Sequence, residues 1–383
     1  MQGLPAGWNC DPDRAALERQ AIFQRTWQFV CHVADLPAAG TAARFDCAGR
    51  SAFVLRTRSG GIAAFLNACR HRGARLVEGD AHTGLAYCVD ARVRCPYHGW
   101  TYDETGALES IPEAQDFGDL DRGAHGLHAL HVAEWHGLVF VAFAAPTHAL
   151  AEMLAPVAAA LPECSSLRRL HEPRTQSVAA DWKLACQHLL DAGHRDIARP
   201  AVQPRVFASP RFAPTGADAL AASVPLASSG NTSWSARTYQ LLLPGDAAAP
   251  RADYVFLWPN LLLCCAPDGL AVTQVLPESA GRSRLREIRY GLPDGSRTMR
   301  LLRYAYERVR RAASRDDLRM LERAQGGAES LDVDASGPVG AGEGAVRWFV
   351  SRYTAACVPP TRRRIKFSPR QRVVAKSRDP AAT

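Results

Sequence analysis

Two short stretches of the sequence each combine one cysteine and one histidine with a nearby glycine. NACRHRGARL places Cys69 two residues before His71, and RCPYHGWTYD places Cys95 three residues before His98. Two thiolates and two neutral imidazoles are the ligands of a [2Fe–2S] cluster in which cysteines hold one iron and histidines the other. The glycines permit the tight turns that wrap such a cluster. This ligand set therefore predicts an electron-transfer centre.

A zinc site is the main alternative, because Zn²⁺ accepts the same four side chains. Zinc modules usually take a pair of cysteines from one loop and a pair of histidines from another. Here each loop supplies one of each. The mixed loops favour the iron–sulfur cluster, with Cys69, His71, Cys95 and His98 as its ligands.

The two loops resemble those of the Rieske non-haem iron oxygenases, specifically the catalytic α subunits of the aromatic-ring-hydroxylating type. TWQFVCH, CPYHGWTYDETGAL and VAEWHGLVFVAF are similar to the same family, so the resemblance covers nearly the whole chain. The stretch between the two loops is longer than is usual in the family, and we interpret AYCVDAR as an extra hairpin there. The resemblance implies that the cluster passes electrons to a mononuclear Fe(II) held by two histidines and one carboxylate.

The resemblance also assigns residues to this second site. Asp191 matches the carboxylate that bridges the cluster and the iron, and His194 matches the first imidazole ligand. Asp317, in the stretch DDLRMLERAQGG, matches the carboxylate ligand. A helix is predicted over DWKLACQHLLDAGHRD, and the three-residue spacing of Asp191 and His194 would place both on one helix face.

The second histidine of this triad is expected five residues after His194, where the sequence has Arg199. A guanidinium has no lone pair to give a metal, and none of the twelve histidines follows His194. His188 is the nearest substitute, but on a continuous helix it would point about 120° away from His194. Alternatively, Arg199 pairs with Asp317 or Asp196 and partly replaces the charge of the metal. The hypothesis is that the chain binds its cluster but holds mononuclear iron weakly or not at all.

The predicted elements indicate an α+β protein. Short β-type runs with glycine-rich turns between Gly40 and Pro146 predict a small antiparallel module. TSWSARTYQLLLP, ADYVFLWPNLLLCCAPDGLAVTQVLP and SRLREIRYGLP are predicted as neighbouring strands of a second sheet, and MRLLRYAYERVRRAASRDDLRMLERAQGGAES as one long helix or two. We predict an N-terminal helical segment that packs on the catalytic domain (1–38), a Rieske module (39–146) and a helix-and-antiparallel-sheet domain of helix-grip type with a basic tail (147–383).

The net charge of +8 is concentrated in Thr361–Arg378, which holds eight Lys or Arg and no acid. A solvated terminal segment explains this run, and no nucleic-acid-binding motif accompanies it. The longest apolar run, GLVFVAFAAP, is about half a membrane span, and the N-terminus carries no visible export signal. We therefore predict a cytoplasmic protein with no membrane or nucleic-acid partner, whose eleven cysteines are reduced thiols or metal ligands.

Two functions are left open by the sequence. The first is an oxygenase, reduced by an NAD(P)H-dependent reductase and/or a ferredoxin, that hydroxylates or demethylates a small aromatic or amine substrate with O₂ in a head-to-tail homotrimer. The second is a non-catalytic Rieske subunit that transfers electrons in a heteromer with an intact homologue. The substrate cavity is expected between YVFLWPNLLLCCAPDG and the helix around Leu189, with a contribution from SWSARTYQ. Phe256, Trp258 and Leu262 either line it or lie in the core.

Overall fold

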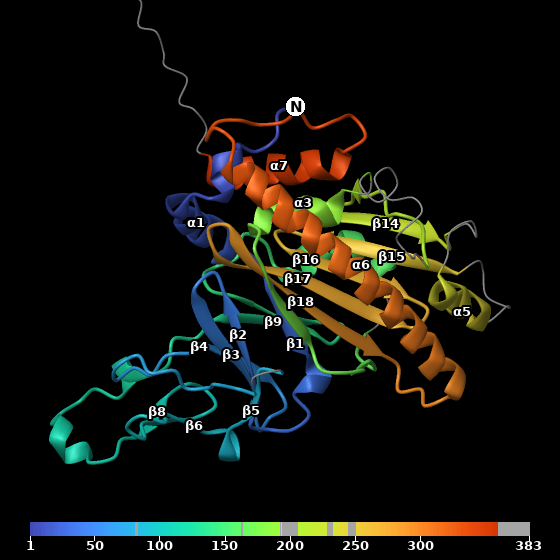
Figure 1. Cartoon of the computed structure of the whole chain (residues 1–383). Helices are drawn as coiled ribbons and strands as arrows, with labels where there is room; N and C mark the ends of the chain where they lie inside the picture. The colour runs from blue at the N-terminus through green and yellow to red at the C-terminus, as the bar shows by residue number, and fades with distance from the viewer. Residues whose placement is uncertain are drawn as a thin grey trace, which may run out of the picture.

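The computed structural model describes residues 1–80, 83–161, 164–191, 193, 206–227, 233–243 and 250–358. A small β module, which contains β2 to β8, lies beside a larger part in which helices cover a broad sheet (Figure 1). This arrangement confirms the predicted α+β class. The domain boundaries at residues 38 and 146 stay a prediction.

The N-terminal segment contains a helix, as predicted. The Asp11 carboxylate accepts a hydrogen bond from the backbone N–H of Asp13 at 2.9 Å and begins α1 (Pro12–Glu18), with proline in the first turn. The segment then forms β1 (Gln28–His32), which is buried along its whole length. The short helical turns are η1 (Ala6–Asn9), η2 (Arg19–Phe23), η3 (Val33–Asp35), η4 (Val89–Ala91), η5 (Ala114–Phe117), η6 (Gly123–His125) and η7 (Ala155–Ala160).

The small module consists of two antiparallel sheets. The four-stranded sheet has the order β4-β3-β2-β5 and the three-stranded sheet the order β6-β7-β8. The predicted AYCVDAR hairpin is wrong: β5 pairs with β2 whereas β6 pairs with β7, so the insertion passes from one sheet to the other. The strands are β2 (Thr41–Cys47), β3 (Arg50–Arg56), β4 (Ile62–Leu66), β5 (Leu85–Tyr87), β6 (Val93–Arg94), β7 (Thr101–Tyr102) and β8 (Leu108–Ser110).

A third small sheet, in the order β1-β10-β9, ties the N-terminal segment to the end of the module. The larger part is built on an eight-stranded antiparallel sheet in the order β11-β18-β17-β16-β15-β14-β13, with β12 paired to β18. Their bounds are β9 (His131–Trp135), β10 (Leu138–Ala142), β11 (Arg168–Arg169), β12 (Arg174–Val178), β13 (Ala213–Pro214), β14 (Ala219–Pro225), β15 (Arg251–Leu257), β16 (Leu261–Ala266), β17 (Gly269–Ser279) and β18 (Arg282–Gly291).

The central strands of this sheet are apolar because both faces are covered. On one face Phe256 and Val275 pack against Trp182 and Phe349, which belong to helices. On the other face the strands pack against α2 (Leu150–Leu154), η7 and β10. The segment after Pro146, which forms α2 and η7, therefore has a packing role, since it closes the second core.

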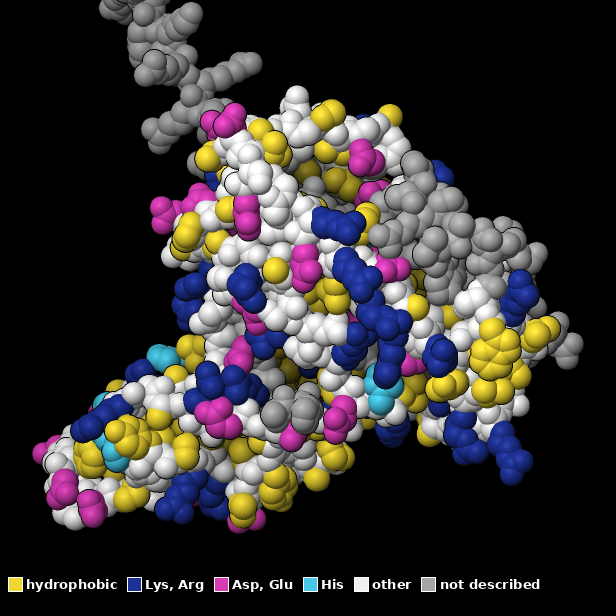
Figure 2. Space-filling model, in the orientation of Figure 1, with side chains coloured by type: hydrophobic (Ala, Val, Ile, Leu, Met, Phe, Trp, Pro, Cys, Tyr) yellow, Lys and Arg dark blue, Asp and Glu magenta, His cyan; other side chains and the backbone are white. Residues whose placement is uncertain are grey.

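One long helix, α6 (Arg297–Glu329), crosses the sheet (Figure 1), which confirms the one-helix alternative. Its inner face buries Leu302, Tyr306 and Val309. Its outer face carries arginines that form a dark-blue stripe in Figure 2. Two shorter helices complete this layer, α3 (Trp182–Leu190) and α7 (Gly344–Cys357).

The prediction of a strand in TSWSARTYQLLLP is wrong, because this stretch forms α5 (Trp234–Leu242). The Ser233 hydroxyl accepts a hydrogen bond from the backbone N–H of Ala236 at 3.3 Å and caps the helix. Ala236 and Tyr239 are buried at helical spacing. The β-branched and aromatic side chains of this stretch are typical of a strand, but the Ser233 cap and the helical spacing of the buried residues favour a helix. No helix in the described part of the chain is long and apolar enough to span a bilayer.

Candidate functional site

The first predicted ligand loop is closed at its base by its own backbone. The N–H of Cys69 donates to the carbonyl of Ala74 at 2.8 Å, and the N–H of Gly73 donates to the carbonyl of Cys69 at 2.9 Å. Gly73 has φ 72°, a left-handed conformation that glycine adopts without steric cost. These two hydrogen bonds therefore close the loop from Cys69 to Ala74 into a tight turn.

The second loop is closed in the same way. The N–H of Cys95 donates to the carbonyl of Trp100 at 2.8 Å, and the N–H of Gly99 donates to the carbonyl of Cys95 at 3.0 Å. Gly99 has φ 73°, and a Cβ on it would lie 3.0 Å from Cγ of Pro112. The two loops are thus equivalent in backbone, although the histidine stands two residues after the cysteine in one and three in the other.

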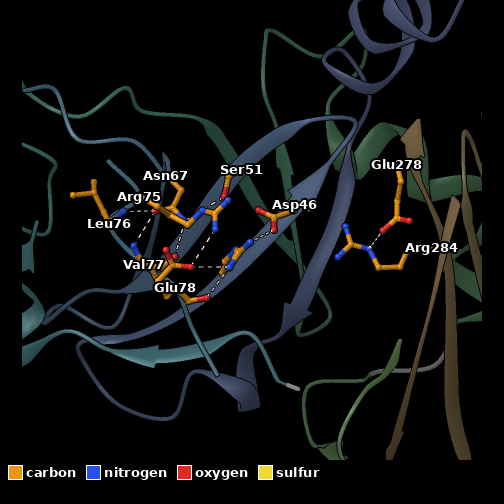
Figure 3. Close-up of polar contacts among 10 residues, drawn as sticks. Asp46, Ser51, Asn67, Arg75, Leu76, Val77, Glu78, Glu278 and Arg284 are labelled. Atoms are coloured by element: carbon orange, nitrogen blue, oxygen red, sulfur yellow. Dashed lines mark hydrogen bonds and ion pairs between the residues drawn. The ribbon is translucent and has the colours of Figure 1, made fainter. Parts of the chain in front are cut away.

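Asn67 holds the first loop to the rest of the module, a contribution that the sequence analysis missed. It is 4% exposed, and its Oδ1 accepts hydrogen bonds from the N–H groups of Leu76 and Val77 at 3.0 and 2.9 Å. Its Nδ2 donates to the carbonyl of Val77 and to Ser51 (Figure 3). One buried amide therefore joins the chain before the loop to the chain after it. Its place two residues before Cys69 was the available signal.

The loops bring their cysteines and histidines to one end of the module. Cys69 and Cys95 are 4% and 2% exposed, whereas His71 is half-buried and His98 is exposed. The two imidazole rings have centroids 4.7 Å apart. The phenol of Tyr102 lies 3.2 Å from Sγ of Cys69. The sulfur atoms therefore lie beneath a surface that the imidazoles form.

The sulfur of Cys95 has the surroundings of a cluster ligand. Burial raises the pKa of this thiol, while the backbone N–H groups of Tyr97 and His98 donate to the sulfur and favour its thiolate; the Cys69 thiol is a further partner. Low exposure with amide donors is the environment in which protein thiolates bind iron–sulfur clusters.

Nδ1 of His71 is buried and has no hydrogen-bond partner among the described residues. The ring stacks on Trp100, with centroids 4.9 Å apart and planes 6° apart, and meets the edge of Phe117 at 5.6 Å. Burial, followed by the proximity of His98, lowers the pKa of His71 and keeps the imidazole neutral. A neutral ring that is fixed by packing and has an unpaired buried nitrogen fits the metal-bound histidine of a Rieske cluster.

Within the described ranges, no three His, Cys, Asp or Glu side chains surround a point that would hold a single ion. A two-iron cluster does not need such a group, because each of its irons takes two protein ligands and bridging sulfides complete the set. The pairing of two buried thiols with two outer imidazoles fits a [2Fe–2S] cluster better than a four-ligand zinc ion.

Only some of the residues predicted for the mononuclear site lie in the part of the chain that the structure describes. His194, Asp196 and Arg199 lie outside it. Asp191 does not lie on the helix as predicted: α3 ends at Leu190, and Asp191 is extended, with φ −81° and ψ 106°. Its carboxylate accepts a hydrogen bond from the N–H of Gly193 at 2.7 Å. This local bond competes with helix continuation, which explains why the helix stops.

Asp317 lies on α6 in the wall of a cavity of about 180 Å³ between α3, α6 and the sheet. Nε2 of His188 on α3 lies 3.4 Å from Oδ1 of Asp317. Of the two alternatives left open for these side chains, Leu262 lines the cavity, whereas Phe256 and Trp258 lie in the core. The SWSARTYQ stretch does not line this cavity.

The sheet side of the cavity carries an ion pair. Arg310 of α6 donates to Oε1 of Glu287 on β18 at 2.6 Å, and Arg174 lies 3.6 Å from the same carboxylate. Burial acts to lower the pKa of Arg310, but Glu287 outweighs it and the pKa is raised. The Arg310 guanidinium therefore keeps its charge beside Glu287 in the wall of the cavity.

A buried charge network, which the sequence analysis missed, positions the helices around the cavity. Nζ of Lys183, which is 1% exposed, lies 2.7 Å from both Glu18 and Asp181. The N–H of Asp181 donates to Oε1 of Gln325 on α6 at 3.0 Å. Burial, opposed by Lys183 and assisted by Glu18, raises the pKa of Asp181 to about 6. Glu18 and Gln325 are distant in sequence from the residues that they contact, so no local pattern indicated them.

Comparisons with known proteins agree with this geometry. Residues 26–130 match the Rieske [2Fe–2S] domain, and residues 168–358 match the ring-hydroxylating alpha subunit catalytic domain. The chain belongs to the family of Rieske oxygenase alpha subunits. The predicted family is therefore confirmed.

Curated relatives include mono- and dioxygenases. The chain is 34% identical over 200 residues to the glycine betaine monooxygenase oxygenase subunit of Chromohalobacter salexigens, covering 51% of this chain and 43% of the relative. It is 34% identical over 131 residues to the chlorobenzene dioxygenase subunit alpha of a Cupriavidus species, covering 34% of this chain and 28% of the relative. The matches thus span less than half of these relatives.

Solved structures share the fold over almost the whole chain. A quaternary ammonium Rieske monooxygenase superimposes with a TM-score of 0.75 at 18% identity, covering 93% of this chain and 95% of the other. Naphthalene 1,2-dioxygenase from a Rhodococcus species superimposes with a TM-score of 0.68 at 19% identity, covering 94% and 95%. At these identities the similarity establishes the fold.

Proposed function

We propose that this chain is the oxygenase component of a Rieske system that oxidises a small, polar organic substrate. The single observation that carries the proposal is the convergence of the two matched loops, with buried Cys69 and Cys95 beneath His71 and His98. These four residues would hold the [2Fe–2S] cluster. When bound, the cluster supplies single electrons and a mononuclear Fe(II) near Asp317 supplies O₂ activation.

The arrangement of the cluster loops supports electron entry from another protein. His98 is exposed and Tyr97, whose ring stacks on it at 3.8 Å between centroids, is 62% exposed. A partner protein that docks on Tyr97 would be separated from the predicted iron ligand His98 by the tyrosine ring alone. We propose an NAD(P)H-dependent reductase and/or a ferredoxin as this partner, and a homotrimer or a heteromer as the assembly.

The chemistry of the cavity narrows the substrate class. Asp317 and the Glu287–Arg310 pair are charged groups in its wall, and Tyr254 and Tyr306 supply aromatic surface. A purely hydrocarbon substrate would displace water from these charges without replacing its hydrogen bonds, which is costly. An amine or quaternary ammonium compound would meet the aromatic rings of Tyr254 and Tyr306 in this wall. We therefore favour the amine alternative over the unsubstituted aromatic one.

A single-turnover experiment tests this function. The protein, with its cluster reconstituted and chemically reduced, is mixed with ¹⁸O₂ and either a methylated ammonium compound, such as glycine betaine, or an aromatic hydrocarbon. We expect cluster oxidation coupled to labelled product, or to formaldehyde, with the amine. Cluster oxidation without product from any substrate would contradict the oxygenase assignment.

The second candidate is a non-catalytic electron-transfer or partner subunit. The observation that favours it is Arg199 at the position of the second imidazole in the sequence. In this case the chain would deliver electrons from its cluster to the iron of an intact homologue. Co-purification with a second α-like chain, together with product formation only in its presence, would support this candidate. Turnover by the isolated chain would exclude it.

A further inference from the structure

The cavity between α3 and α6 has one histidine in its described wall, His188. Its side chain is 12% exposed, and Nε2 lies 3.4 Å from Oδ1 of Asp317, which is 19% exposed. The two side chains come from different helices, and the Asp181–Gln325 hydrogen bond joins those helices. The juxtaposition is therefore fixed by the packing of the helices and does not depend on a loop.

On one continuous helix through residue 194, the side chain of His188 would point away from that of His194. Since α3 ends at Leu190 and Asp191 is extended, helical periodicity does not relate residue 188 to residue 194. Arg199 offers no lone pair, and no histidine follows His194 in the sequence. His188 is thus the histidine that the described cavity offers to Asp317.

The separation of the two atoms matches that of two ligands of one metal ion. Ligands about 2.1 Å from an ion lie about 3.0 Å apart at an angle of 90° and about 3.4 Å apart near 110°. A charge-assisted hydrogen bond between imidazolium and carboxylate would be shorter, at about 2.7–2.9 Å. Imidazole and carboxylate are also the donor types of the mononuclear iron site of non-haem oxygenases.

We propose that His188 is the imidazole ligand that takes the place of the one absent at position 199, and that it binds mononuclear Fe(II) together with Asp317. This inference rests on the proposed oxygenase function. It predicts that the chain holds iron beyond its cluster in spite of Arg199. The assignment of His194 as a further ligand stays a sequence prediction, because His194 lies outside the described residues.

The test uses the full chain with its cluster reconstituted, titrated anaerobically with ferrous ions. The readouts are the iron bound beyond the cluster, determined by metal and sulfide analysis, and the EPR signal of the ferrous nitrosyl adduct. His188→Ala and the better-matched His188→Asn are compared with Asp317→Asn. The control is His171→Ala, which removes a histidine whose Nε2 lies 4.0 Å from Oε2 of Glu307, outside this cavity.

We expect the wild type and the His171 variant to bind one iron beyond the cluster and to give the nitrosyl signal. Both His188 variants and the Asp317 variant should bind this additional iron with an affinity about tenfold lower or worse. Their cluster absorption spectrum should be unchanged. Wild-type affinity in both His188 variants, or no additional iron in the wild type, would overturn the proposal. Failure of the proposed function differs from this result, because it would show as a missing cluster or as absent turnover in protein that carries both metal centres.

Discussion

Oε1 of Gln325 accepts a hydrogen bond from the backbone N–H of Asp181 at 3.0 Å, and this contact joins the helices that carry Asp317 and His188. Gln325 is 3% exposed and Asp181 1%. The cap of α3 is therefore held by α6, and the two walls of the cavity are positioned by one buried amide.

Replacement of Gln325 by leucine should destabilise the protein by about 1–3 kcal/mol, because the buried N–H of Asp181 loses its acceptor. Urea unfolding followed by circular dichroism measures the loss. Glu322→Gln is the matched control, since Glu322 is exposed on the same helix and should change stability by less than about 0.5 kcal/mol. Equal stability of the Gln325→Leu variant and the wild type would contradict the role of this contact.

Tyr102 should raise the reduction potential of the cluster. The N–H of Arg70 donates to the phenol oxygen at 3.0 Å, so the phenol proton is free to point at Sγ of Cys69, 3.2 Å away. Burial and Cys69 also raise the pKa of Tyr102, which keeps the phenol protonated. A hydrogen bond to a ligand sulfur stabilises the more negative, reduced cluster.

The variant Tyr102→Phe should therefore have a lower potential and an unchanged iron content, as measured by redox titration followed by EPR. Tyr87→Phe is the control, because Tyr87 is in the same module and 66% exposed. An unchanged or higher potential in the Tyr102 variant would show that the phenol does not donate to the cluster ligand.

Asp181 should make stability fall as the pH rises from about 4 to about 6. Its pKa is raised from 3.8 to about 6 by burial, against the opposing charge of Lys183 and with the support of Glu18. Between these two values the folded state binds more protons than the unfolded state, so each rise in pH favours unfolding. The stabilisation that the protonated carboxyl provides is complete below pH 3.8 and is lost above about pH 6.

Asp181→Asn should remove this pH dependence and retain an N-cap acceptor for α3. The difference in unfolding free energy between variant and wild type should grow by about 1–3 kcal/mol from pH 4 to pH 6. Asp13→Asn, at an exposed carboxylate, should show no such trend. Parallel stability curves for the Asp181 variant and the wild type would rule out this carboxyl as the titrating group.

The cluster site and the fold class were predictable from sequence because their determinants are local. Each ligand loop contains its thiol, its imidazole and the glycine that closes it, and strands such as β16 are apolar runs. The ion pair of Lys183 with Glu18 was not predictable, since the two residues are 165 positions apart in the sequence. The end of α3 was also missed, because the bond from Gly193 to Asp191 is a competing local structure that helical periodicity does not register.

Cys69, His71, Cys95 and His98 are the proposed ligands of an iron–sulfur cluster between the two loops. The most direct measurement is the iron and sulfide content of anaerobically reconstituted protein, with the EPR spectrum after dithionite reduction, for Cys69→Ser, Cys95→Ser and the control Cys88→Ser. Cys88 is a half-buried free cysteine of the same module.

We expect the wild type and the Cys88 variant to give a [2Fe–2S] EPR signal with the g-value anisotropy that histidine ligation produces. The Cys69 and Cys95 variants should lose both the signal and the sulfide. Binding of zinc without sulfide in the wild type, or a full signal in Cys69→Ser and Cys95→Ser, would contradict this ligand assignment.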